Sequence, residues 1–133
     1  MRVYSLKDRI TVKIDELEFK LAPLSYKQKI EIQSLLTSGK EVEGTILAVK
    51  YSVKHVSGLE DSDGNEYKLS FENDSLTEDS IDALMNIECG IKLQLACAHL
   101  LNGIPKEIIH PETGKAIEGV KVVNPSIKKK KKH

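Results

Sequence analysis

The sequence predicts an α+β fold: a mainly helical single domain with an N-terminal β-hairpin and short additional strands. Near the N-terminus, apolar residues alternate with polar ones, which is the period of a half-buried strand. Further along, apolar residues recur every three or four positions, which is the period of an amphipathic helix. The length of 133 residues fits one domain with its own core.

The predicted hairpin covers residues 9 to 22. Its two strands are separated by a short polar turn, and Pro23 ends the second strand. Six apolar residues alternate with polar ones on the two sides of that turn: Ile10, Val12, Ile14, Leu17, Phe19 and Leu21.

Two helices are predicted next, over residues 26 to 38 and 41 to 57. Ser25 and Gln28 have the spacing of a capping box at the start of the first helix. The second helix carries one apolar stripe and would stop at Gly58, although its β-branched residues are better strand formers. The stripe consists of Val42, Ile46, Val49, Val53 and Val56.

Turns, short strands and further helices are predicted for the remaining residues. We expect a turn at 61 to 65, a strand at 66 to 72 and a helix capped by Thr77. The sequence ECG interrupts that helix before an apolar helix over 91 to 102. Residues 104 to 123 are predicted to form a strand, a turn and a strand. The predicted globular domain therefore spans 1–123, and 124–133 is predicted to be a disordered basic tail.

The charge of the chain is unevenly placed. The 20 basic and 20 acidic residues balance, but five of the bases are Lys128 to Lys132. Without them 15 basic residues remain, so the rest of the chain carries about −5. Nucleic-acid binding needs clustered Lys and Arg, and is therefore not expected of this domain. The apolar stretches are too short to span a membrane, and the first ten residues are too polar for a secretory signal.

No residue pattern indicates catalysis, a cofactor or a metal site, so we predict a protein that is not an enzyme. Cys89 and Cys97 lie about two turns apart in a predicted helical region, too far for a disulfide, and are expected to be buried thiols. The four histidines lack metal-ligand spacing, and His99 is expected to be structural. The acidic residues around Gly64 are out of frame for a calcium loop and indicate a turn.

The order of these features resembles the tail assembly chaperones of long-tailed bacteriophages, over about residues 9 to 103. The residues that carry the resemblance are Phe19, Leu21, Pro23 and Leu24 in "FKLAPLSYKQKIEIQSLL", followed by the acidic "LTEDSIDALM". The resemblance implies a non-catalytic protein of the bacterial host cytoplasm. It would bind the phage tape-measure protein and help to recruit tail-tube subunits. The alternative function is a virion structural or head-tail joining protein.

A chaperone for a long helical partner should offer an apolar groove with an acidic rim. Two apolar stripes are the candidate partner-binding residues, and both could equally be core. They are Ile46, Val49, Val53 and Val56 in one stripe, and Leu93, Cys97, Leu100 and Leu101 in the other.

The lysine run has three interpretations, which the sequence leaves open. Chaperones of this family are commonly made in two lengths by ribosomal frameshifting, and Lys128 to Lys132 can be encoded by an unbroken run of adenines. The run would then record a frameshift site that also produces a longer form of the protein. The other two interpretations are an inert tail and a basic tail that binds phosphates.

Overall fold

The computed structural model describes residues 3–126, and its helices and strands confirm the predicted α+β class. They are, in order, β1 (Arg9–Ile14), β2 (Leu17–Leu21), α1 (Tyr26–Thr37), α2 (Glu41–Ser52), β3 (Val53–Ser57), β4 (Phe71–Glu72), β5 (Ser75–Leu76), α3 (Glu78–Asn86), α4 (Gly90–His99), the 3-10 helix η1 (Leu100–Asn102) and β6 (Val120–Ser126).

Strands β1 and β2 form the predicted hairpin at the centre of a four-stranded antiparallel sheet. The order of the sheet is β3-β2-β1-β6. Asp15 closes the hairpin with a left-handed φ of 55°, a conformation that Asp tolerates better than most residues. β4 and β5 pair separately as a short second sheet.

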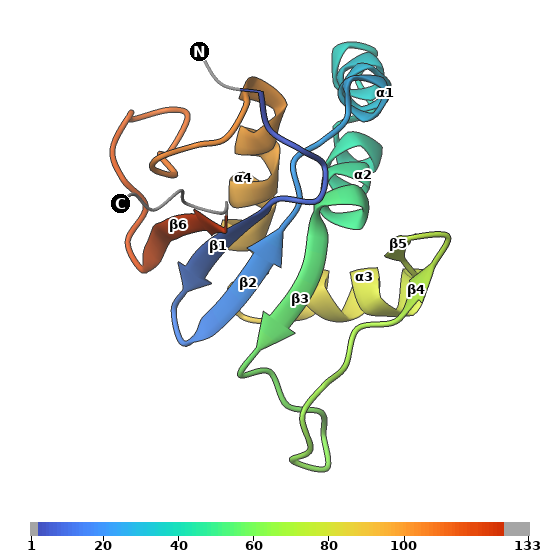
Figure 1. Ribbon diagram of the computed structural model, residues 1–133, viewed down its shortest axis with the longest axis vertical. Helices are drawn as coiled ribbons and strands as arrows, with labels where there is room; N and C mark the ends of the chain where they lie inside the picture. The colour runs from blue at the N-terminus through green and yellow to red at the C-terminus, as the bar shows by residue number, and fades with distance from the viewer. Residues whose placement is uncertain (1–2, 127–133) are drawn as a thin grey trace, which may run out of the picture.

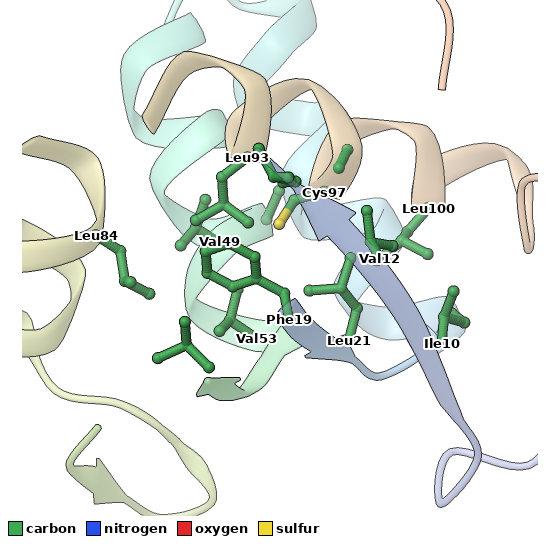
Figure 2. Close-up of a cluster of buried hydrophobic side chains, with 14 of the residues drawn as sticks. Ile10, Val12, Phe19, Leu21, Val49, Val53, Leu84, Leu93, Cys97 and Leu100 are labelled. Carbon is green, nitrogen blue, oxygen red and sulfur yellow. The ribbon is translucent and has the colours of Figure 1, made fainter. Parts of the chain in front are cut away.

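The helices lie on one side of the main sheet, and the core fills the space between the two layers (Figure 1). Figure 2 shows the ring of Phe19 among side chains from the helices, including Val49 of α2 and Leu93 of α4. The apolar residues that alternate along β1 and β2 point into this layer, which is why the period-two pattern was informative. Five of them are at most 1% exposed: Ile10, Val12, Ile14, Phe19 and Leu21.

The predicted helix starts are confirmed. Ser25 and Gln28 form the capping box of α1: the Ser25 N–H donates to Gln28 Oε1 at 2.9 Å, and the Gln28 N–H donates to Ser25 Oγ at 3.1 Å. Thr77 caps α3 by accepting from the Ser80 N–H. The apolar helix after ECG runs through α4 and continues as η1 to Asn102.

The helix predicted over 41 to 57 is wrong in its second part, because α2 ends at Ser52 and β3 begins at Val53. The register between β2 and β3 shifts between Lys20 and Leu21, which leaves Lys54 as an extra residue. Through this β-bulge, Val53 and Val56 face the same side although they are three residues apart. A bulged strand therefore reproduced the spacing of a helix.

The strand predicted over 66 to 72 is also wrong for most of its length. Glu66 forms an isolated bridge with Glu60, and only Phe71–Glu72 is a strand. The Ser70 N–H donates to the buried Ser80 Oγ at 2.8 Å instead of to a neighbouring strand. The Ser80 side chain of α3 thus accepts a hydrogen bond from a backbone N–H that we had expected to pair with a neighbouring strand.

The last predicted strand pair is largely replaced by loop. The turn at residues 110 to 115 is present, but its flanks meet only in one bridge, between Ile109 and Ala116. β6 pairs with β1 instead, and it continues to Ser126, three residues past the boundary predicted at Val123. Residues 127–133 of the predicted tail lie outside the described residues.

Candidate functional site

The predicted partner-binding stripes belong mainly to the core. Val49, Val53, Val56, Leu93, Cys97 and Leu100 are at most 2% exposed, while Ile46 and Leu101 are partly buried. They face one another across the sheet and the helices, since α2, β3 and α4 share one apolar layer (Figure 2). The two stripes are therefore not an exposed binding face, and this part of the prediction is corrected.

A groove of about 420 Å³ is one apolar candidate for a binding site in the described residues. Such a volume falls within the range of small-ligand pockets and can also hold a few side chains of a protein partner. Three parts of the chain form its walls: the N-terminal segment, the start of α1, and the residues around η1. The lining residues are Tyr4, Leu6, Pro23, Leu24, Lys29, Leu100, Asn102, Gly103 and Ile104.

The lining of this groove has one charged residue, Lys29, and it includes no acid. The acidic rim that we expected is therefore not part of the groove lining. Leu100 reaches the groove although only 1% of it is exposed, so it is the member of the predicted stripes nearest to a surface site.

Helix α1, which contributes Lys29 to the groove lining, also carries exposed apolar side chains. Tyr26 is 79% exposed and Ile30 is 50% exposed. Tyr26 lies one helical turn before the groove residue Lys29, and Ile30 lies one turn after Tyr26. Leu6, which is 54% exposed, adds apolar surface from the N-terminal segment. Together with the groove, these residues form what we call the groove surface.

A second hollow, of about 560 Å³, is polar. It lies between the end of α2 and the β4–β5 turn, and its lining includes Lys50, Glu72 and Asp79. Within residues 3–126, no group of three or more His, Cys, Asp and Glu side chains is placed to hold a metal ion. The lining of this hollow also holds Ser75 and Thr77, and neither hydroxyl is hydrogen-bonded to a carboxylate or a lysine in the described residues.

Both cysteines are free and buried, as predicted. Burial raises the pKa of the Cys97 thiol to about 12. Burial and then the charge of Asp15 raise the pKa of Cys89. Since the thiolate is the reactive form, neither sulfur is activated as a nucleophile at neutral pH.

His99 has the structural role that we expected. Its Nε2 accepts from the Ile109 N–H at 3.1 Å, so its Nδ1 carries the proton and donates to the Leu95 carbonyl at 2.8 Å. The side chain thereby ties the loop after η1 to α4. The turn around Gly64 is confirmed as well, since Asp61 Oδ1 accepts from the N–H groups of Asp63 and Asn65.

Sequence reasoning missed the groove surface, because its walls come from segments that are distant in the sequence. One signal was available: Tyr26 and Ile30 lie four apart, on the side of the helix opposite Ile32, the one buried residue of α1. Pro23 and Leu24, which carry part of the family resemblance, also line the groove.

Comparisons of this chain with protein-family models, with curated proteins and with solved structures find no match. Within residues 3–126, every helix is too short or too polar to cross a membrane.

Proposed function

We propose that this protein is a tail assembly chaperone of a long-tailed bacteriophage. It binds the tape-measure protein in the cytoplasm of the bacterial host and helps to recruit tail-tube subunits, without catalysing a reaction. The resemblance around Phe19, Leu21, Pro23 and Leu24 supports the family, and the groove surface is the structural observation that carries the binding role.

An amphipathic helix is the partner that this surface suits. Helix-binding grooves take apolar side chains from one face of a helix, spaced by three or four residues. A tape-measure protein is long and helical with apolar stripes, so it presents such anchors repeatedly. The groove would hold the apolar anchor side chains of the partner helix. Further exposed apolar contacts would come from Leu6, Tyr26 and Ile30.

Co-expression with the tape-measure protein tests the proposal. We expect the chaperone to keep the tape-measure protein in the soluble fraction and to co-purify with it. The double variant Leu6→Glu/Ile30→Glu should lose the complex, because two charges would be buried against an apolar helix without a partner.

The matched control is Val42→Glu/Ile91→Glu. Val42 is 71% exposed and Ile91 is 69% exposed, and neither lines the groove. The control should bind like the unaltered chain, with circular dichroism confirming that both variants fold. Failure to obtain a soluble complex would refute the chaperone role, and equal binding by both double variants would refute the groove surface.

Mass spectrometry of purified virions separates the chaperone from the alternative, a virion structural or head-tail joining protein. A chaperone acts before the particle is complete and should be depleted from it. Recovery of this chain at a fixed copy number per virion would favour the structural role and contradict the proposal.

A frameshifted longer form is part of the proposal. Lys128 to Lys132 lie outside the described residues, so this point rests on the sequence alone. We expect the gene to carry an unbroken adenine run there and phage-infected cells to contain a second, longer product. AAG codons within the run would rule this origin out.

A further inference from the structure

The face of the main sheet that points away from the helices carries no helix in the described part of the chain (Figure 1). Alternation along the strands assigns its side chains, because Ile10, Val12 and Ile14 point into the core. We call this the open sheet face. Its residues are Arg9, Lys13, Glu18, Lys20, His55 and Lys121, and Thr11 lies among them but is only 6% exposed.

The open sheet face is basic, although the protein without its lysine run is acidic. It has four cationic side chains and one acidic side chain, Glu18. Lys20 lies 3.7 Å from the Glu18 carboxylate and donates to Thr11 Oγ1 at 3.0 Å. Glu18 is therefore already engaged on this face.

Lys13 and Lys121 are directly opposite each other in the β1–β6 register. Like charges in that position destabilise a sheet unless an anion lies nearby. Within residues 3–126 neither lysine forms an ion pair, and both are exposed. Glu18 lies opposite Lys13 on β2, but its carboxylate is paired with Lys20, so Lys13 and Lys121 leave excess positive charge on this face. This excess is the feature that indicates an acidic partner.

A strongly acidic segment is present on the same chain. Residues 60–88, which we call the acidic segment, contain ten acidic residues and one basic residue, a formal charge of −9. The acidic residues are all exposed: Glu60, Asp61, Asp63, Glu66, Glu72, Asp74, Glu78, Asp79, Asp82 and Glu88.

The two surfaces are separated within one molecule. The acidic segment follows β3, and Lys121 lies on β6 at the other edge of the sheet (Figure 1). Three strand spacings of about 4.8 Å place Lys121 roughly 14 Å from β3. That distance exceeds the Debye length of about 10 Å at 0.1 M salt, so salt largely screens Lys121 from the acidic residues that follow β3.

We propose that the open sheet face binds the acidic segment of a second copy of this chain. The two surfaces differ, so the contact is head-to-tail, and each added copy leaves one surface of each kind free. Such contacts close into a ring or extend as a filament. This self-association goes beyond the proposed chaperone function and does not depend on it.

Sedimentation velocity of the purified full chain tests the proposal. At about 0.05 M salt, the sedimentation coefficient should rise with protein concentration. At about 0.5 M salt, the chain should sediment as a monomer, because screening weakens contacts between exposed charges. A monomer at low salt over the whole concentration range would overturn the proposal, and so would a salt effect that is independent of protein concentration.

Charge-reversal variants identify the surfaces. Lys13→Glu/Lys121→Glu alters the open sheet face, and Glu72→Lys/Asp82→Lys alters the acidic segment. Each variant alone should stay monomeric at low salt. A mixture of the two should associate again, since each variant keeps the surface that the other lacks and the two reversed surfaces have opposite charge.

The matched control is Lys106→Glu/Lys115→Glu, which makes the same change in net charge at exposed positions away from the sheet. It should associate like the unaltered chain. If it also becomes monomeric, net charge rather than the open sheet face governs association and the proposal fails. Formation of the mixed complex shows that both variants are folded, so a variant that merely misfolds cannot imitate the expected result.

Discussion

The β1–β2 hairpin and helix α1 are both rich in apolar residues, but they place them in opposite environments. The hairpin buries its apolar side chains almost completely, whereas Ile32 is the one buried residue of α1. A strand in the middle of this sheet meets the helical layer along its whole length. α1 meets mainly α2, so its other side stays exposed, including Tyr26 and Ile30. Apolar pattern alone therefore does not identify a binding surface.

The contact between α1 and α2 is close, but it involves only one side of α1. A Cβ at Gly44 would lie 2.7 Å from Leu36 Cδ2, so the two helices approach closely where Gly44 is. α1 is therefore packed tightly on one side. Among the described residues, no element covers the side that carries Tyr26. The following predictions test this contrast, from the largest expected effect to the smallest.

Phe19→Ala should have the largest effect, because it removes a fully buried ring from the centre of the core. Large-to-small changes of this kind lower the free energy of unfolding by about 3 to 5 kcal/mol. Urea unfolding followed by circular dichroism measures the loss, which should appear as a lower midpoint with an unchanged slope. A loss below about 1 kcal/mol, within the range of surface changes, would mean that the hairpin does not anchor the core as described.

Truncation at β6 tests the outer edge of the hairpin. A chain that ends after Val123 loses the pairing of Arg9, Ile10 and Thr11 with residues 124–126. With a net contribution of about 0.5 to 1.5 kcal/mol for each hydrogen bond, we expect a loss of roughly 1 to 3 kcal/mol. A chain that ends after Ser126 keeps this pairing and should change by less than about 0.5 kcal/mol. Equal thermal midpoints for the two truncated chains would contradict the role of the β6 end.

Alkaline pH tests the core beneath the hairpin through Cys97. Its pKa is raised from 9.0 to about 12 in the folded chain, so the folded state keeps a proton that the unfolded state loses. This contribution is complete below pH 9 and is lost as the pH rises from 9 towards 12. The slope should approach about 1.4 kcal/mol per pH unit.

The comparison is between urea unfolding of the unaltered chain and of Cys97→Ala, under reducing conditions at several values of pH from 8 to 10.5. Other groups that titrate contribute equally to both proteins. The difference in free energy between the two should therefore shrink as the pH rises. If the free energies of unfolding of the two proteins change in parallel with pH, then burial does not raise the pKa of Cys97, and its thiol is accessible to water.

The smallest effect on stability is expected for Tyr26→Ser/Ile30→Ser. Both side chains are exposed, so the free energy of unfolding should change by less than about 0.5 kcal/mol. The same variant should nevertheless weaken the proposed complex with the tape-measure protein in co-purification. A large drop in the unfolding midpoint would instead place these residues in a structural role and would remove the contrast with the hairpin.

Local sequence patterns were sufficient to predict an element where the pattern fits only one kind of structure. The hairpin was predicted because a two-residue period fits one buried face, and α1 was predicted because Ser25 and Gln28 cap it reciprocally. The prediction failed at Val53 and Val56, where a β-bulge imitates the spacing of a helix. At Ser70, a hydrogen bond to a distant side chain replaced a strand, and no local pattern reports that.

The candidate site was less predictable than the fold, for a different reason. Leu93 and Cys97 had the pattern of a possible binding stripe, but such a pattern is the same whether a partner or the protein's own sheet covers it. Leu6 and Ile104 line one groove although about a hundred residues separate them in the chain. A surface assembled in this way becomes visible only when the topology is known.

The partnership of β1 with β6 also constrains how the chain is made. β1 is synthesised before β6, and the strand that covers its outer edge follows roughly a hundred residues later. At 5–20 residues per second that edge stays unpaired for about 5 to 20 s on the ribosome. During this interval a nascent chain presents unpaired backbone groups to its neighbours on the same messenger. Neighbouring chains on one polysome could then pair through β1 before β6 arrives. The proposed chaperone would, by this topology, have an interval during synthesis in which it is itself prone to aggregate.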